Sequence, residues 1–370
     1  MIEIRNSILK YIINHKGFYV LFLFFIGIPG HSQNTIKNLS PKSYIAYQTS
    51  EKITIDGVAS EESWEKSKST DLFIDIKGTK IPKYETSVKM LWDHEFVYFF
   101  AAIKEPHVWG DLKKRDTIVF YNNDFEIFID PDNDTHNYYE FEVNALNTLW
   151  DLFITKPYRE GTPVLNDWDA NGFKSAVKIN GTLNNAKDID KGWAIEIAIP
   201  FKVFKTSYYQ NNIPKDIFWR VNFSRVNWDF EIHNNKYYRK KDQKGKFESE
   251  YNWVWSPMGV INMHRPEDWG YVYFSSKKAG ELDVFEIPKE EKVKQLLYQL
   301  YRKQKVFFKN NNRWATSFNE LGQNDVRIED KKVLRTIENH QTGFNITIAS
   351  PFTERLFIIK EDGKIITKED

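Results

Sequence analysis

The chain contains no cysteine, which excludes disulfides, a lipid-attachment cysteine and a cysteine nucleophile. It also has no excess of charge of either sign: the chain has 52 basic and 51 acidic side chains, and there is no long basic run. This balance gives no general attraction to nucleic acid or to an anionic membrane surface. A glycine-rich phosphate loop and a His-Glu-x-x-His motif are absent as well. The sequence therefore predicts a protein that is stabilised by packing and has no nucleic-acid partner.

No apolar run is long enough for a membrane-spanning helix, which needs roughly 20 residues. The longest run, residues 18–28, follows three basic residues and ends at Pro29, before the small-x-small segment 30–32. This order is typical of a secretory signal peptide over residues 1–32. We expect cleavage to leave Gln33 as the first residue of a periplasmic or extracellular protein without a membrane span. A retained membrane anchor is the alternative.

Helical periodicity is nearly absent between about residues 53 and 275, apart from one turn around Glu61–Lys66 that places Trp64 inward. Short strand-like runs separated by Gly, Pro, Asn and Asp fill the region instead. The expected strands are 87–92, 96–103, 125–130, 138–144, 148–155, 174–179, 193–199, 218–226 and 271–275. Such a series indicates an all-β sandwich or barrel. We predict a mainly β fold, an antiparallel β-sandwich over residues 50–276.

The composition changes after residue 276. Residues 289–308 carry apolar side chains at helix spacing on one face. A second short helix is expected over 316–322. Strands are expected over 344–349, 355–359 and 364–367, and a turn at Asp362-Gly363 joins the last two. This order predicts a small α+β appendage over residues 289–370, which loosely resembles a pilin-like helix-plus-sheet unit.

Four short motifs follow one another in the body. They are Ile55-Asp56-Gly57 with Glu61 and Trp64, Met90–Asp93 leading into Val97–Phe99, Asn123–Asp130, and Gly192–Pro200. In this order, residues from about 53 to 275 resemble carbohydrate-binding module family 9, within a wider superfamily of sugar- and haem-binding sandwiches. The resemblance implies a β-sandwich that binds sugars between aromatic side chains and often holds structural calcium. It places the aromatic clamp at Phe120 or Tyr121 and at Met263, where this chain has no ring.

A polar row is expected on the strand Tyr138–Asn144, where side chains alternate between two faces. Tyr138, Glu140, Glu142 and Asn144 form this row, and Trp150 follows shortly after it. Carboxylates and amides hydrogen-bond sugar hydroxyls, and aromatic rings cover the apolar face of a sugar. Two interpretations stay open: the row faces solvent, or Glu142, Asn144 and Trp150 contact a glycan together with the nearby loop of Met263 and His264.

Two further residues have both a functional and a structural interpretation. Trp168 lies between acids in a loop and is either a stacking platform or a packed anchor. Arg225 lies on a strand between apolar residues, so it must pair either with a carboxylate or with a ligand oxygen. The full set of candidate ligand-binding residues is Phe120, Tyr121, Glu142, Asn144, Trp150, Trp168, Arg225, Met263 and His264.

Asp130, Asp132 and Asp134 have the alternating spacing that suits a hard cation, which prefers several oxygen ligands. The segment is not an EF-hand loop, because Thr135 and Phe141 occupy its sixth and twelfth positions. Structural calcium is therefore one interpretation. A solvated turn, in which the aspartates cap the backbone, is the other.

The sequence thus predicts an exported carbohydrate-binding protein that acts in glycan capture or polysaccharide catabolism, with no catalytic residue assigned. A carbohydrate-active enzyme is the first alternative. A glycoside hydrolase needs two carboxyl groups about 5 to 9.5 Å apart, which sequence spacing does not reveal. A haem-b electron carrier is the second alternative, for which Met90, Met258, Met263 and His264 are available ligands. We do not expect haem.

Overall fold

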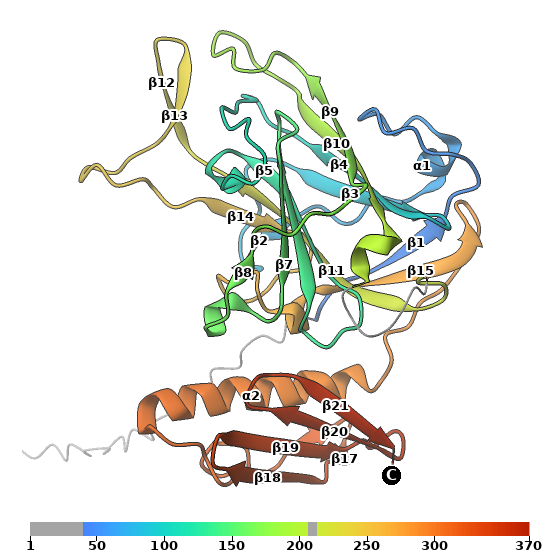
Figure 1. Cartoon of the computed structure of the whole chain (residues 1–370), viewed down its shortest axis with the longest axis vertical. Helices are drawn as coiled ribbons and strands as arrows, with labels where there is room; N and C mark the ends of the chain where they lie inside the picture. Colours follow the sequence, from blue (N-terminus) through green and yellow to red (C-terminus); the bar gives the residue numbers. More distant parts are fainter. Residues whose placement is uncertain (1–39, 206–212, 370) are drawn as a thin grey trace, which may run out of the picture. The chain divides into compact units, whose positions relative to one another are not determined.

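The computed structural model describes residues 40–205 and 213–369 (Figure 1). The predicted signal peptide, residues 1–32, lies outside the described residues. Residues 39–370 form one compact unit. Within the described part of the chain, no helix is both long enough and apolar enough to cross a membrane.

Two layers of strands form the predicted β-sandwich, which confirms the fold class. The first layer is β9 (Lys174–Asn180), β10 (Gly192–Pro200), β4 (Phe96–Ile103), β3 (Thr86–Trp92), β1 (Ser43–Gln48) and β15 (Gly270–Lys278). The second is β8 (Val164–Leu165), β7 (Leu149–Ile154), β6 (Tyr138–Asn144), β5 (Asp124–Asp130), β11 (Phe218–Asn227), β14 (Tyr251–Val254) and β2 (Ile74–Asp75). Pairing is antiparallel except where β1 runs parallel to β15 and β3. β11 connects the layers, because its first residues pair with β15 and its last with β14.

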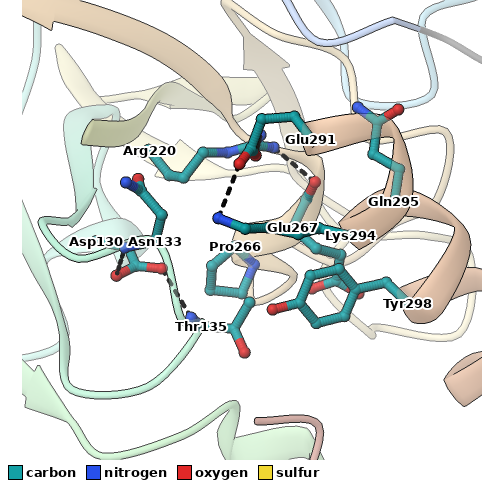
Figure 2. A pocket seen from close by; sticks show the side chains of 10 residues that line it. All are labelled: Asp130, Asn133, Thr135, Arg220, Pro266, Glu267, Glu291, Lys294, Gln295 and Tyr298. Atoms are coloured by element: carbon teal, nitrogen blue, oxygen red, sulfur yellow. Dashed lines mark hydrogen bonds and ion pairs between the residues drawn. The ribbon is translucent and has the colours of Figure 1, made fainter. Parts of the chain in front are cut away.

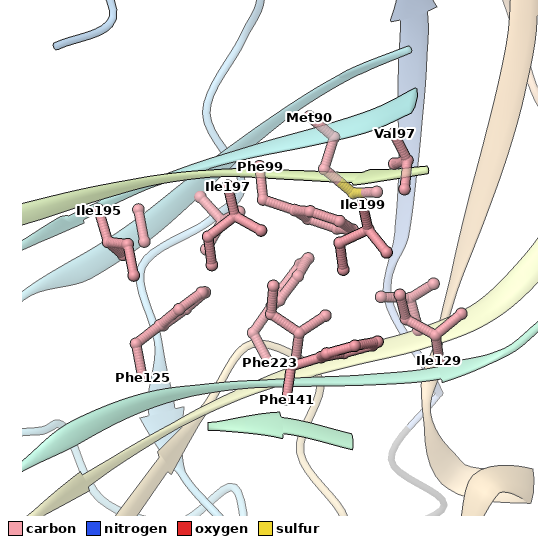
Figure 3. Close-up of a cluster of buried hydrophobic side chains, with 14 of the residues drawn as sticks. Met90, Val97, Phe99, Phe125, Ile129, Phe141, Ile195, Ile197, Ile199 and Phe223 are labelled. Atoms are coloured by element: carbon pink, nitrogen blue, oxygen red, sulfur yellow. The ribbon is translucent and has the colours of Figure 1, made fainter. Parts of the chain in front are cut away.

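The main core lies between the layers, as Figure 3 shows. Ile195, Ile197 and Ile199 of β10 point from the first layer toward Phe125 and Phe141 of the second, and all five are fully buried. Alternate residues of each strand face this core because side chains of a strand point to opposite faces. Burying one such side chain contributes about 1.5–3 kcal/mol.

The first and fourth sequence motifs meet at the side chain of Glu196 on β10. The predicted helical turn is α1 (Glu62–Lys66), and its Trp64 is fully buried, with Nε1 donating to Glu196 Oε1 at 2.9 Å. Glu196 Oε2 accepts the backbone N–H groups of Asp56 and Gly57 at 3.0 and 3.1 Å. Gly57 has a φ of +84°, and a Cβ there would lie 3.0 Å from the backbone nitrogen of Lys178. The motif therefore attaches the loop that precedes α1 to the sheet.

Several strands were not predicted, and each carries a weak pattern. β1 precedes the predicted boundary at residue 50 and belongs to the sheet. β2 and β8 have two residues each, too few for a periodic signal. β12 (Phe230–His233) and β13 (Lys236–Arg239) form a hairpin of mostly polar residues.

The C-terminal segment is the predicted α+β unit. Helix α2 (Glu291–Asn311) packs its apolar face on the sheet β18 (Arg335–His340), β19 (Gly343–Ala349), β20 (Arg355–Lys360) and β21 (Ile365–Glu369). The short pair β16 (Arg327–Ile328) and β17 (Lys331–Lys332) precedes this sheet. The helix predicted over 316–322 is wrong, because the segment forms turns. The Glu320 carboxylate accepts the backbone N–H of Thr316, a side-chain bond that competes with a helix too short to be stable alone.

Buried charges join α2 to the sandwich, and Figure 2 shows part of this contact. Arg302 of α2 donates from Nε to Glu267 Oε1 at 2.8 Å and also pairs with Glu160. Tyr271 of β15 donates to Glu291 of α2 at 3.2 Å. Next to these residues lies a cavity of about 10 Å³, which holds about one water molecule. Truncation after residue 276 would leave the buried charges of the sandwich without their partners on α2.

Candidate functional site

Four acidic side chains lie together on the outer face of the second layer. Phe125 and Ile127 of β5 face the main core, so the alternate residues Asp124 and Glu126 face outward. Beside them on β6 lie Glu140 and Glu142, and Glu126 stands directly opposite Glu142. We call Asp124, Glu126, Glu140 and Glu142 the acid row. All four are 0–5% exposed, so the interpretation of a solvent-facing row is wrong.

The acid row is electrostatically unfavourable as it stands. Like charges directly opposite one another destabilise a sheet. Burial, followed by repulsion between the acids, raises the pKa values of Asp124, Glu140 and Glu142 well above their usual range. Burial also raises the pKa of Glu126 to about 7, and nearby Glu250 acts in the same direction. A fold that keeps such a cluster has a reason other than stability.

The acid row should make stability fall as pH rises. The folded state holds a proton on Glu126 up to about pH 7, whereas the unfolded chain releases it near the ordinary value of 4.5. Between these values the folded state binds more protons, so the free energy of unfolding decreases with rising pH. Asp124, Glu140, Glu142 and Glu250 face this group, and their charges add to the trend. Urea unfolding at pH 5, 6 and 7 should show a smaller decrease for Glu126→Gln than for the parent; an identical decrease would contradict the assignment.

Aromatic rings flank the acid row near Glu142. The turn η1 (Val119–Tyr121) carries Phe120, whose backbone N–H donates to Glu142 Oε2 at 3.1 Å. Trp150 of β7 stands opposite Glu142, and its ring stacks on Phe120 with centroids 6.3 Å apart. Tyr121 contacts Phe120 edge-on and is 42% exposed. The Trp150 Nε1 atom is buried and has no hydrogen-bond partner among the described residues, so it offers a free donor beside the row.

A second pair of rings flanks the acid row near Glu140. His264 Nε2 lies 3.9 Å from Glu140 Oε2, and a 2.8 Å hydrogen bond joins His264 Nδ1 to the Tyr138 hydroxyl. Burial lowers the pKa of His264 to about 3, so the ring is neutral at physiological pH. Tyr158, in η2 (Tyr158–Glu160), lies with its ring centroid 4.2 Å from that of His264. Burial raises the pKa of Tyr158, and the negative charge of Glu140 acts in the same direction.

The Met263 side chain packs inside the protein and does not face the acid row. It is 6% exposed within a small apolar cluster, and its carbonyl accepts Trp269 Nε1 at 2.7 Å. On this side, the ring next to His264 is that of Tyr158. The Trp150 ring pairs with Phe120.

Two further predicted site residues, Asn144 and Trp168, make contacts within the fold. Asn144 is fully buried and holds the turn after β6: its side-chain oxygen accepts the N–H groups of Leu146 and Thr148, and its amide donates to Leu112. Trp168 packs against Tyr139 on the core face of β6, with centroids 5.2 Å apart. Asn144 is therefore engaged in the turn beside the acid row, opposite Asp124. Trp168 lies on the other face of β6 and is partly exposed, so its contact with a ligand stays a prediction.

Arg225 is also a structural residue. It is fully buried, and its Nη2 lies 3.5 Å from Glu105 Oε2. Nη1 donates to the carbonyl of Lys104 at 2.9 Å, and the guanidinium lies over the ring of Trp253. Of the two interpretations of Arg225, the structure shows the pairing with a carboxylate.

The three aspartates predicted to hold a cation come together in the turn after β5. Each offers a carboxylate oxygen within 4.8 Å of the other two. Asp130 is fully buried and accepts the N–H groups of Asn133 and Thr135 at 3.1 and 2.9 Å, so the turn is capped but not simply solvated. Lys364 of the C-terminal unit lies with Nζ 2.9 Å from Asp134 Oδ2.

Reasoning from sequence missed Asp124, Glu126 and Tyr158. The two acids alternate along Asn123–Asp130 in the same way as the acids of the next strand, so the signal was present. Tyr158 lies in an irregular turn, and no local pattern marks it.

The fold and site define a class: a β-sandwich with a polar outer face flanked by aromatic rings. Comparison with known proteins agrees with this class. The family model described as "Carbohydrate family 9 binding domain-like" matches residues 55–217. Residues 55–217 are therefore similar to the family 9 carbohydrate-binding domain, and this similarity covers less than half of the chain.

Over 156 residues, 41% of this chain, the sequence is 29% identical to endo-1,4-beta-xylanase A of Thermotoga maritima, and the match covers only 12% of that enzyme. Solved relatives include a family 9 module from Caldicellulosiruptor kristjanssonii in complex with cellotriose, with a TM-score of 0.39 and 14% identity over 66% of this chain and all of that module. The same module in complex with glucose has a TM-score of 0.40 and 13% identity, and covers 65% of this chain and again all of the module.

Proposed function

We propose that the protein is an exported carbohydrate-binding protein whose glycan lies over the acid row, between the Phe120–Trp150 pair and the His264–Tyr158 pair. The observation that carries the proposal is the combination of buried hydrogen-bonding groups and flanking rings on one sheet face. Sugars have hydroxyl edges and apolar faces, so they match both features. Buried polar groups with no partner are costly and indicate that a ligand supplies one.

The groups of the site provide both donors and acceptors. A carboxylate with a raised pKa accepts hydrogen bonds when ionised and donates one when protonated. Trp150 Nε1 adds a donor without a partner. The rings of Phe120 and Tyr158 can cover the apolar faces of a sugar at the two ends of the row.

The proposed role is glycan capture or polysaccharide catabolism. The match to a xylanase supports this role, although it spans a small part of that enzyme. The signal-like segment 1–32 supports export, and N-terminal sequencing of the mature protein should find Gln33 or a close neighbour. Protein that keeps Met1 in the membrane fraction would contradict export.

A glycan array probed with the mature protein tests the function. Saturable binding to at least one oligosaccharide, with no released product, is expected for a binding protein. A blank array would contradict the proposal. Product release that Glu142→Gln abolishes would favour a hydrolase instead.

We also propose that the turn of Asp130, Asp132 and Asp134 holds structural calcium. The fit rests on three clustered carboxylates and on Asp132 Oδ1, which is buried with no hydrogen-bond partner among the described residues. Chelation should lower the melting temperature, and added calcium should restore it. At a calcium concentration of 100 times the Kd, binding should add about 2.7 kcal/mol to the free energy of unfolding. Lys364→Met should raise calcium affinity because it removes the competing ammonium. Asp130→Asn should abolish the chelator effect while the exposed control Asp325→Asn keeps it; chelator-insensitive melting of the parent would contradict calcium.

A further inference from the structure

The acid row concentrates negative charge without a compensating cation. Asp124, Glu126 and Glu142 each offer a carboxylate oxygen within 4.8 Å of the others, and Glu140 lies beside them. Among the described residues, no lysine or arginine forms an ion pair with any of the four. The partner of Glu140 within 4.0 Å is His264, which is neutral at physiological pH. Burial and mutual repulsion therefore favour the protonated form of these carboxyl groups.

Asp124 gives a second indication that a positively charged donor is missing. Its side chain is fully buried, and Oδ1 accepts the backbone N–H of Val226 at 3.3 Å. Oδ2 is buried and has no hydrogen-bond partner among the described residues. A buried carboxylate oxygen in this state is unfavourable unless a ligand donates to it.

The arginines near the flanking rings are already engaged elsewhere. Arg159 donates from Nη1 to the carbonyl of Ile261 at 2.8 Å. Arg239 lies over the rings of Tyr121 and Trp228, 4.4 and 4.6 Å from their centroids. Neither forms an ion pair with the acid row, so neither supplies a compensating positive charge.

The flanking rings favour a cationic sugar over a bare metal ion. A hard cation prefers six to eight oxygen ligands, whereas the row is flanked by Phe120, Trp150 and Tyr158. An amino sugar matches both the acids and the aromatic rings. Its ammonium group makes charge-assisted hydrogen bonds to carboxylates, and its sugar ring stacks on the aromatic side chains.

We propose that the preferred ligands are amino sugars with a free amine, of the glucosamine type, and that acidic sugars are rejected. This inference rests on the proposed function, because it names the ligand class of the same site. The ammonium group lies over Asp124, Glu126 and Glu142 and displaces the protons that the row holds without ligand.

The test uses three tetramers with the same β-1,4 backbone, built from glucosamine, N-acetylglucosamine or glucose. Calorimetry at pH 6 with chelator present should show the glucosamine tetramer binding at least about tenfold more tightly than the glucose tetramer. Titration in two buffers of different ionisation enthalpy should show proton release for the glucosamine tetramer alone. Glu142→Gln and Glu126→Gln should reduce this preference, while Glu338→Gln, an exposed charge on β18, should keep it.

The outcomes separate this inference from the proposed function. Equal affinity for the glucose and glucosamine tetramers would overturn the ligand class but leave glycan binding in place. A neutral or acidic glycan as the best array hit would overturn it in the same way. If calcium chloride alone bound saturably and Glu142→Gln lost this binding, the cation at the acid row would be a metal ion. No binding to any tetramer, together with a blank array, would instead contradict the proposed function.

Discussion

Replacing Trp150 with alanine should weaken glycan binding by at least about tenfold, or ~1.4 kcal/mol, without unfolding the protein. The indole stacks on Phe120 and is only partly buried, so its loss removes a ligand surface and a free Nε1 donor. Tyr158→Ala should have a similar effect, because Tyr158 supplies the ring at the other end of the acid row. Calorimetry with the best array hit measures both losses, and circular dichroism checks the fold.

Trp168→Ala is the matched control for Trp150→Ala. The same residue type is removed, but Trp168 packs against Tyr139 on the core face. The variant should lose stability and keep its affinity. If it lost binding while Trp150→Ala and Tyr158→Ala bound as tightly as the parent, the site would lie at Trp168 instead.

Replacing Arg225 with methionine should lower the free energy of unfolding by about 3–5 kcal/mol. Methionine fills much of the same space, but it leaves Glu105 as a buried carboxylate without its charged partner. The remaining partners of Glu105 are Asn123 and Trp193, which donate hydrogen bonds but carry no charge. Urea unfolding measures the loss.

Arg327→Met is the control, because Arg327 is exposed and its ion pair with Asp325 is a surface contact. Such pairs contribute roughly 0–1 kcal/mol. Folded Arg225→Met protein should bind glycan normally at low temperature. A small change in stability combined with lost binding would return Arg225 to a role at the ligand.

Short runs of apolar and aromatic residues bounded by turn residues predicted much of the sandwich. The runs 96–103 and 138–144 coincide with β4 and β6. The same signal missed β2, which has two residues, and the hairpin β12–β13, whose strands have four residues each. The segment 316–322 shows the opposite error, in which a helix-like composition is overridden by the side-chain bond from Thr316 to Glu320.

The site was predicted only in part, because it depends on contacts between distant segments. The residues Glu142, Phe120, Tyr121, Trp150 and His264 gather at the acid row. Alternation identified the polar face of β6, but it could not show that β5 adds two more acids opposite it. Likewise, nothing local distinguishes Arg225, which is paired with Glu105 some 120 residues away, from an arginine that binds a ligand.

A crystal structure of the mature protein with the best array hit tests the central claim most directly. We expect a sugar ring between the Phe120–Trp150 pair and the His264–Tyr158 pair, with at least one hydrogen bond to Glu126, Glu140 or Glu142. Ordered sugar at any other surface, with the acid row unchanged, would contradict the account.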